Sequence, residues 1–290
     1  MSGERPFPAG PALLFCPADR PDRFAKAADR SDVVVLDLED AVAPERRARA
    51  RQALADAPLD PDRTVVRINA VGTADHDADL AALAATDYRT VMVPKVDAAL
   101  PTLGYAVVAL CETAAGVLAA PQLAARDDVV ALMWGAEDLV ASLGGTSSRR
   151  PDGAYRDVAR LARAQVLLAA GAAGKVAVDA VHLDIGDLDG LRAEAQDAAA
   201  SGFGATACIH PSHVPVIRAA YAPDLAAVSA ARDLLEVAAS RDGVFVHDGR
   251  MVDGPVLQHA AAVLQRARAA GALTDETVPR TTPHETEERR

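Results

Sequence analysis

The sequence predicts an α/β protein, a closed (β/α)8 TIM barrel with a small C-terminal lid extension. Three observations predict this fold. Short apolar runs alternate with helix-like segments, the runs have the composition of buried strands, and an ionisable residue follows almost every run. Apolar strands that alternate with helices indicate a parallel sheet buried on both faces.

Eight runs rich in Val, Ile or Leu are too short for helices, and we expect them to be strands. In chain order they are Ala12–Cys16, Val33–Leu38, Thr64–Ile68, Thr90–Val93, Ala106–Cys111, Val129–Trp134, Lys175–Val181 and Thr206–Ile209. The helices expected between them are Arg20–Ala28, Pro44–Ala57, Ala74–Thr86, a shorter Lys95–Leu103, Gly116–Ala125, Asp157–Ala170 and Asp189–Ser201.

An open, doubly wound sheet is the alternative to a barrel. Such a sheet usually carries a glycine-rich phosphate loop after its first strand. The first strand here runs into Cys16-Pro17-Ala18-Asp19-Arg20, which is no such loop. Eight strands in a chain of this length also match a closed barrel better than an open sheet.

The region after the last expected strand predicts a small extension of two helices and a hairpin. Pro223–Ala239 has helical spacing, and residues 243–253 predict a hairpin with its turn at Asp248-Gly249. Gly254–Ala270 predicts an amphipathic helix, and the chain then becomes polar enough to predict disorder. We therefore expect a barrel over 1–222, a C-terminal helical and hairpin extension over 223–272 and a disordered tail over 273–290.

Composition excludes several classes of function. A net charge of −11 and 3% aromatic residues argue against binding of nucleic acid. No apolar run reaches the roughly 18 residues of a membrane span, and no secretory signal is visible. Three cysteines, Cys16, Cys111 and Cys208, lie far apart in apolar runs. They predict reduced core residues of a cytoplasmic protein.

Polar residues gather where the expected strands end. In a barrel, these ends converge on the one face that carries the chemistry, which predicts an enzyme active site. The residues are, in chain order, Asp37, Glu39, Asp40, Arg67, Asn69, Lys95, Glu112, Glu137, Asp138, Asp179 and His210.

Several of these residues also have a structural interpretation. Asp40 suits the cap of the following helix equally well. Arg67 can pair with a nearby acid, and Lys95 can be a surface residue or an ion-pair partner. For His210 a structural hydrogen bond is favoured over catalysis, and Asp179 fits either role.

Glu112 and Asp138 predict a metal site. They follow consecutive strands, and the one cysteine beside them, Cys111, belongs to an apolar run. Two hard carboxylates of this kind suit Mg²⁺ or Mn²⁺, with water and substrate oxygens as further ligands. A structural pair would repel and need neutralising by Arg67 or Lys95, so the metal interpretation is favoured.

The sequence resembles the citrate lyase β-subunit-like branch of the HpcH/HpaI aldolase superfamily over roughly residues 11–270. Two departures are Pro17-Ala18, where the family commonly has Pro-Gly, and His213, where it often has Gln. The matching motifs are Leu14-Phe15-Cys16-Pro17, Val35-Leu36-Asp37-Leu38-Glu39-Asp40-Ala41-Val42, Val66-Arg67-Ile68-Asn69, Val93-Pro94-Lys95, Cys111-Glu112-Thr113, Gly135-Ala136-Glu137-Asp138-Leu139, Cys208-Ile209-His210-Pro211 and Gly249-Arg250-Met251-Val252-Asp253.

The resemblance implies Mg²⁺ on Glu112 and Asp138, and a homo-oligomer, either a trimer or a hexamer. It also implies that Arg67 contacts the reacting oxygens. A lid reaching over a neighbouring subunit would supply Asp253 as the acid or base. We expect Arg67, Lys95 and the Gly135-Ala136-Glu137 segment to bind substrate.

The expected reaction is reversible cleavage of a small β-hydroxyacyl-CoA, such as malyl-, citramalyl- or citryl-CoA, into an acyl-CoA and a 2-oxo acid. Asp253, or a residue of the Asp37–Asp40 group (Asp37 or Glu39), would remove the hydroxyl proton. Arg67 would stabilise the thioester enolate.

Three alternatives stay open. They are a carrier-dependent citrate lyase β-like subunit, an aldolase acting on free 2-oxo or hydroxy acids, and a non-catalytic barrel scaffold. The intact lid motif with Asp253 favours a stand-alone enzyme, and the acidic pair argues against a scaffold.

Overall fold

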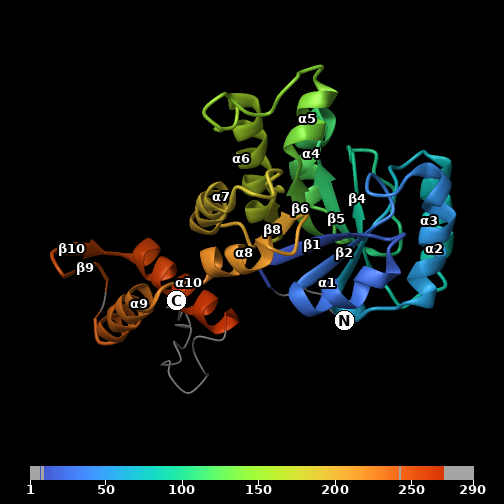
Figure 1. Cartoon of the computed structure of the whole chain (residues 1–290). Helices are drawn as coiled ribbons and strands as arrows, with labels where there is room; N and C mark the ends of the chain where they lie inside the picture. Colours follow the sequence, from blue (N-terminus) through green and yellow to red (C-terminus); the bar gives the residue numbers. More distant parts are fainter. Residues whose placement is uncertain (1–6, 8–9, 242, 271–290) are drawn as a thin grey trace, which may run out of the picture. The chain divides into compact units, whose positions relative to one another are not determined.

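The computed structural model describes residues 7, 10–241 and 243–270, and the chain divides into two compact units, Met1–Ala220 and Tyr221–Arg290 (Figure 1). The first unit is a closed parallel barrel in which each strand pairs with the next and β8 returns to β1. The predicted barrel is confirmed. Its strands are β1 (Ala12–Pro17), β2 (Val33–Asp37), β3 (Thr64–Arg67), β4 (Thr90–Val93), β5 (Ala106–Cys111), β6 (Val129–Trp134), β7 (Val176–Asp179) and β8 (Ala205–Cys208).

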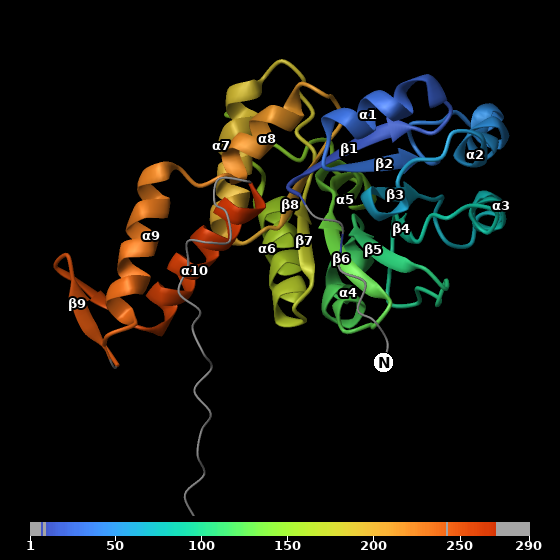
Figure 2. The same ribbon diagram turned by 90° about the horizontal axis from the view of Figure 1, so that it is seen from below.

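Helices surround this ring of strands, as the two views in Figures 1 and 2 show. The strands are short and buried on both faces, as parallel strands covered by helices should be. The helices of the first unit are α1 (Phe24–Arg30), α2 (Arg47–Asp56), α3 (Ala74–Leu83), α4 (Ala114–Ala124), α5 (Ala136–Ser142), α6 (Asp157–Ala172), α7 (Leu188–Ser201) and α8 (His213–Tyr221).

Side chains fill the inside of the barrel, so it is a packed core and not a pore. The cluster includes Leu13, Val35, Met92 and Met133, each at most 3% exposed. The three cysteines are free and buried, which confirms the expectation from their apolar neighbours.

The helix expected over Lys95–Leu103 is wrong, because turns and irregular backbone connect β4 to β5. Lys95 has a left-handed backbone with a φ of 52°, which starts no helix. Pro101 further disfavours the helical conformation at the residue before it. The short helices α5 and α8 were not predicted, and α5 places Glu137 and Asp138 in a helical first turn.

The second unit has a small core of its own. It contains α9 (Leu225–Ala238), the antiparallel strands β9 (Phe245–His247) and β10 (Arg250–Val252), and α10 (Gly254–Ala269). The predicted turn is confirmed, since Asp248 and Gly249 both have positive φ. The carboxylate of Asp253 caps α10 by accepting the Val256 N–H at 3.3 Å. The tail predicted over 273–290 lies outside the described residues.

In the part of the chain that the structure describes, no helix combines the length and apolar character needed to cross a membrane.

Candidate active site

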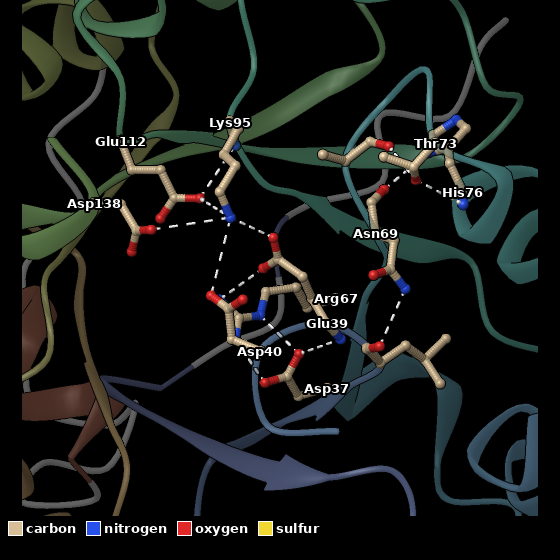
Figure 3. A network of polar contacts seen from close by, with 12 residues as sticks. Asp37, Glu39, Asp40, Arg67, Asn69, Thr73, His76, Lys95, Glu112 and Asp138 are labelled. Atoms are coloured by element: carbon tan, nitrogen blue, oxygen red, sulfur yellow. Dashed lines mark hydrogen bonds and ion pairs between the residues drawn. The ribbon is translucent and has the colours of Figure 1, made fainter. Parts of the chain in front are cut away.

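Five consecutive strands bring charged side chains to the C-terminal mouth of the barrel (Figure 3). Asp37 ends β2 and Arg67 ends β3, while Lys95 follows β4 by two residues. Glu112 follows β5 directly, and Asp138 lies in the first turn of α5, just after β6. Separated by up to about a hundred residues in the chain, these groups are neighbours because parallel strands end on one face.

Asp37 and Arg67 form a bidentate ion pair. Arg67 Nε donates to Asp37 Oδ1 at 2.8 Å and Nη2 donates to Oδ2 at 2.6 Å. The two residues also face each other in the β2–β3 register, so backbone pairing sets this contact. Asp37 is 1% exposed and accepts the backbone N–H groups of Glu39 and Ala41 as well. Its oxygens are thus fully engaged in orienting Arg67 and the loop after β2.

Arg67 turns its remaining terminal nitrogen toward a second acid. Arg67 Nη1 lies 3.1 Å from Glu39 Oε2, without hydrogen-bond geometry, and the guanidinium carbon lies 4.9 Å from the Phe15 ring centroid. Burial alone would lower the pKa of Arg67, but the hydrogen bonds and charge of Asp37 and the charge of Glu39 raise it. Arg67 therefore stays charged, with Nη1 at the mouth.

Lys95 is the hub of the cluster in Figure 3. Its Nζ donates to Glu39 Oε1 at 2.5 Å and lies 3.9 Å from Asp40 Oδ2, from Glu112 Oε1 and from Asp138 Oδ1. The backbone of Lys95 is left-handed, which is uncommon for a residue with a side chain. Burial alone would lower the pKa of Lys95, but the hydrogen bond and charge of Glu39 raise it.

Glu112 is held tightly and is 2% exposed. Its Oε1 accepts the Lys95 backbone N–H at 3.1 Å. Gly135 permits its position, because a Cβ on Gly135 would lie 2.9 Å from Glu112 Cβ and 3.0 Å from Oε2. Burial raises the pKa of Glu112 to about 8, with further contributions from the charges of Asp138 and Glu39.

The Glu112–Asp138 pair fits a divalent cation. A buried carboxylate with a raised pKa beside a second carboxylate is an arrangement that positive charge stabilises. Asp138 is 41% exposed along its side chain, so it is open to solvent and substrate. Among the described residues, no three or more His, Cys, Asp or Glu side chains form a metal cage. Two protein carboxylates with water and substrate oxygens are typical of Mg²⁺.

The raised pKa of Glu112 predicts a pH-dependent stability. Its carboxyl titrates near its ordinary value of 4.5 in the unfolded chain and near about 8 in the folded one. Between these values the folded protein binds more protons, so the free energy of unfolding falls as the pH rises. Scanning calorimetry in EDTA should therefore find Glu112→Gln gaining stability over the wild type from about pH 5 to about pH 8. A difference in stability between Glu112→Gln and the wild type that is the same at about pH 5 and about pH 8 would contradict this prediction.

Other predicted residues have structural partners. Asn69 donates to Leu38 O and to Asp79 Oδ2, so it ties the β3 end to α3. Glu137 accepts a hydrogen bond from Ser148 Oγ at 2.5 Å. His210 is exposed and pairs with the Ser212 hydroxyl, as its structural interpretation predicted.

Asp179, whose role the sequence left undecided, belongs to a structural network. Its carboxylate accepts Trp134 Nε1–H at 2.6 Å and the Nε and Nη2 groups of Arg163. Arg163 also pairs with Asp197 on α7. This network links β6, β7, α6 and α7.

Two contacts of the site were not predicted from the sequence. Phe15 lies against Arg67, and Ser148 holds Glu137. Phe15 stands on β1, which the sequence did locate. Ser148 comes from an irregular segment after α5, and no pattern in the sequence marks it.

Comparison with known proteins decides the family. The model of the HpcH/HpaI aldolase/citrate lyase family matches residues 12–101 and 102–211. The chain belongs to the HpcH/HpaI aldolase/citrate lyase family. The resemblance drawn from the strand-end motifs is therefore confirmed.

Members of the HpcH/HpaI family match nearly the whole chain. The citrate lyase subunit beta-like protein of Mycobacterium tuberculosis (strain H37Rv) is 58% identical over 265 residues, 90% of this chain and 97% of that protein. A (3S)-malyl-CoA thioesterase of Cereibacter sphaeroides (strain KD131) is 31% identical over 278 residues, 90% of this chain and 96% of that protein.

A solved structure of the family shares the fold. The crystal structure of protein CitE from Mycobacterium tuberculosis, in complex with magnesium, acetoacetate and coenzyme A, matches with a TM-score of 0.85 and 58% identity. The match covers 90% of this chain and 98% of that chain.

Proposed function

We propose that this HpcH/HpaI family member is a Mg²⁺-dependent carbon–carbon lyase. It would reversibly cleave a small β-hydroxyacyl-CoA, such as malyl-, citramalyl- or citryl-CoA, into acetyl-CoA or another acyl-CoA and a 2-oxo acid. The observation that carries the proposal is the mouth of the barrel, where the Glu112–Asp138 pair lies beside Arg67 and Lys95. The magnesium and coenzyme A bound by the related CitE protein support it.

Glu112 and Asp138 would hold the metal, Mg²⁺ or in its place Mn²⁺. When bound, the cation would polarise and orient oxygens of the 2-oxo acid half of the substrate. Gly135 and Ala136 bring α5 against Glu112, so the Gly135-Ala136-Glu137 segment would line the substrate site.

Arg67 would stabilise the thioester enolate through Nη1, where negative charge develops. Asp37 would position Arg67 and not act as a base, because its oxygens already accept four hydrogen bonds. Glu39 is the better base within the barrel, since burial raises its pKa and its Oε2 accepts no hydrogen bond. Lys95 would bind substrate at this mouth.

Asp253 is the second candidate acid or base. We propose that residues 223–272 act as a lid on the barrel of 1–222, and that a homo-oligomer, a trimer or a hexamer, supplies Asp253 from an adjacent chain. Three buried free thiols are consistent with a reducing cytoplasm.

The test is incubation of the wild-type protein with malyl-, citramalyl- and citryl-CoA, with Mg²⁺ or with EDTA. We expect one ester to give acyl-CoA and 2-oxo acid in equal amounts, with Mg²⁺ only. Free CoA and hydroxy acid would instead indicate thioester hydrolysis, the activity in the name of the Cereibacter relative. Conversion of pyruvate with an aldehyde alone would indicate a free-acid aldolase. Turnover only on an acyl-carrier protein would indicate a citrate lyase subunit.

A further inference from the structure

Lys95 has a position in the cluster that substrate binding alone does not explain. Its Nζ lies 3.9 Å from Glu112 Oε1 and 3.9 Å from Asp138 Oδ1. Among the described residues, no other lysine or arginine forms an ion pair with either carboxylate. The ammonium is thus the counter-charge shared by the two groups that suit a divalent cation.

We propose that Lys95 competes with the divalent cation for Glu112 and Asp138, and that its ammonium leaves the pair when the cation binds. The inference rests on the proposed metal site, because it takes these two carboxylates as the ligands. A cation bound to both oxygens would lie at short range from Nζ, where two positive charges repel strongly. Binding of the metal and retention of the Lys95 contacts are therefore in conflict.

The site offers the displaced ammonium a second partner. Lys95 Nζ already donates to Glu39 Oε1 at 2.5 Å and lies 3.9 Å from Asp40. Its side chain is 36% exposed, so the ammonium can turn toward these acids and solvent without entering the core. The exchange thus needs a rotation of one side chain.

The backbone of Lys95 has a separate task. Its N–H donates to Glu112 Oε1 at 3.1 Å, from a residue whose backbone is left-handed with a φ of 52°. This bond does not depend on the ammonium, so Glu112 keeps its place when the side chain moves. Lys95 thereby orients the Glu112 carboxylate through its backbone N–H and offsets the charge of that carboxylate through its ammonium.

The exchange would couple metal binding to the substrate-binding charges. Glu39 lies between Lys95 and Arg67, at 2.5 Å from Nζ and 3.1 Å from Nη1. Because Lys95 and Arg67 share this acid, a movement of the ammonium changes the charge beside Arg67 Nη1.

Lysine NMR tests the exchange in the full-length wild-type chain. The sequence contains three lysines, Lys26, Lys95 and Lys175. With [ε-¹³C]lysine labelling and assignment by single variants, we expect Mg²⁺ titration to shift the Lys95 ε-methylene signal and leave those of Lys26 and Lys175 in place. If Mg²⁺ binds saturably but the Lys95 ε-methylene signal does not shift, Lys95 does not compete with the cation. The proposed metal site would be unaffected by that result.

Calorimetric titration with Mg²⁺ gives a second readout. We expect Lys95→Met to bind Mg²⁺ about tenfold more tightly than the wild type, because the competing charge is gone. Lys26→Met, an exposed lysine on α1, is the matched control and should bind as the wild type does. Equal or weaker binding by Lys95→Met would overturn the proposal. No Mg²⁺ binding by the wild type would overturn the proposed metal site together with it.

Discussion

Arg67→Ala is expected to lower turnover by about 10²–10³-fold and the free energy of unfolding by about 3–5 kcal/mol. The first effect follows from the proposed role of Arg67, whose charge would stabilise the enolate. The second follows from the structure, in which Asp37 is 1% exposed and depends on two hydrogen bonds from Arg67. Removal of the guanidinium leaves a buried carboxylate without its counter-charge.

Two measurements separate these effects. Chemical unfolding at fixed protein concentration gives stability, and the lyase assay gives turnover. Asp37→Asn in the Arg67→Ala background removes the unpaired charge and should recover part of the stability but none of the turnover. Arg30→Ala, at the exposed end of α1, is the control and should change both quantities little. A fully stable Arg67→Ala protein would contradict the structural half of this prediction.

Asp138→Asn is expected to reduce turnover by about 10³-fold while leaving the fold intact. The loss follows because a metal ion contributes several kcal/mol to stabilising the transition state. The intact fold follows because the Asp138 side chain is 41% exposed and, among the described residues, its one ion pair is the long 3.9 Å contact with Lys95. Calorimetric Mg²⁺ titration should show weakened binding, and thermal unfolding in EDTA should show no loss of stability relative to the wild type.

The matched control lies at the other end of the same strand. Asp127 is exposed and precedes β6, whereas Asp138 follows it. Asp127→Asn makes the same chemical change at the opposite mouth and should leave turnover and Mg²⁺ binding unaltered. If Asp138→Asn kept the turnover of the wild type, Asp138 would not be a metal ligand.

Much of the barrel could be predicted because strand and helix signals are local. Apolar runs located all eight strands, and Thr90–Val93, Ala106–Cys111 and Val129–Trp134 match the structure at both ends. The helix expected after β4 is absent because Lys95 has a left-handed backbone, and its N–H donates to Glu112, which follows the next strand. No pattern within the segment itself reports such a contact.

The residue types at the strand ends were determined by the sequence alone. Carboxylates, an arginine and a lysine follow successive strands, and barrel closure requires these ends to meet on one face. The sequence alone therefore predicts one candidate site that contains Arg67, Lys95, Glu112 and Asp138. The sequence does not determine which of these groups pair, because each can reach several charged neighbours at the mouth.

Only the tertiary structure decided which groups pair. The β2–β3 register places Asp37 opposite Arg67, so that its carboxylate accepts hydrogen bonds from the guanidinium. Gly135 has no side chain, which leaves room for Glu112 in the interior. Burial there raises the pKa of Glu112 to about 8. Both outcomes depend on distances of a few ångströms between residues at the ends of neighbouring strands, more than twenty positions apart in the chain. Charge and hydrogen bonding act over those distances, whereas a linear pattern records only the order of the residues.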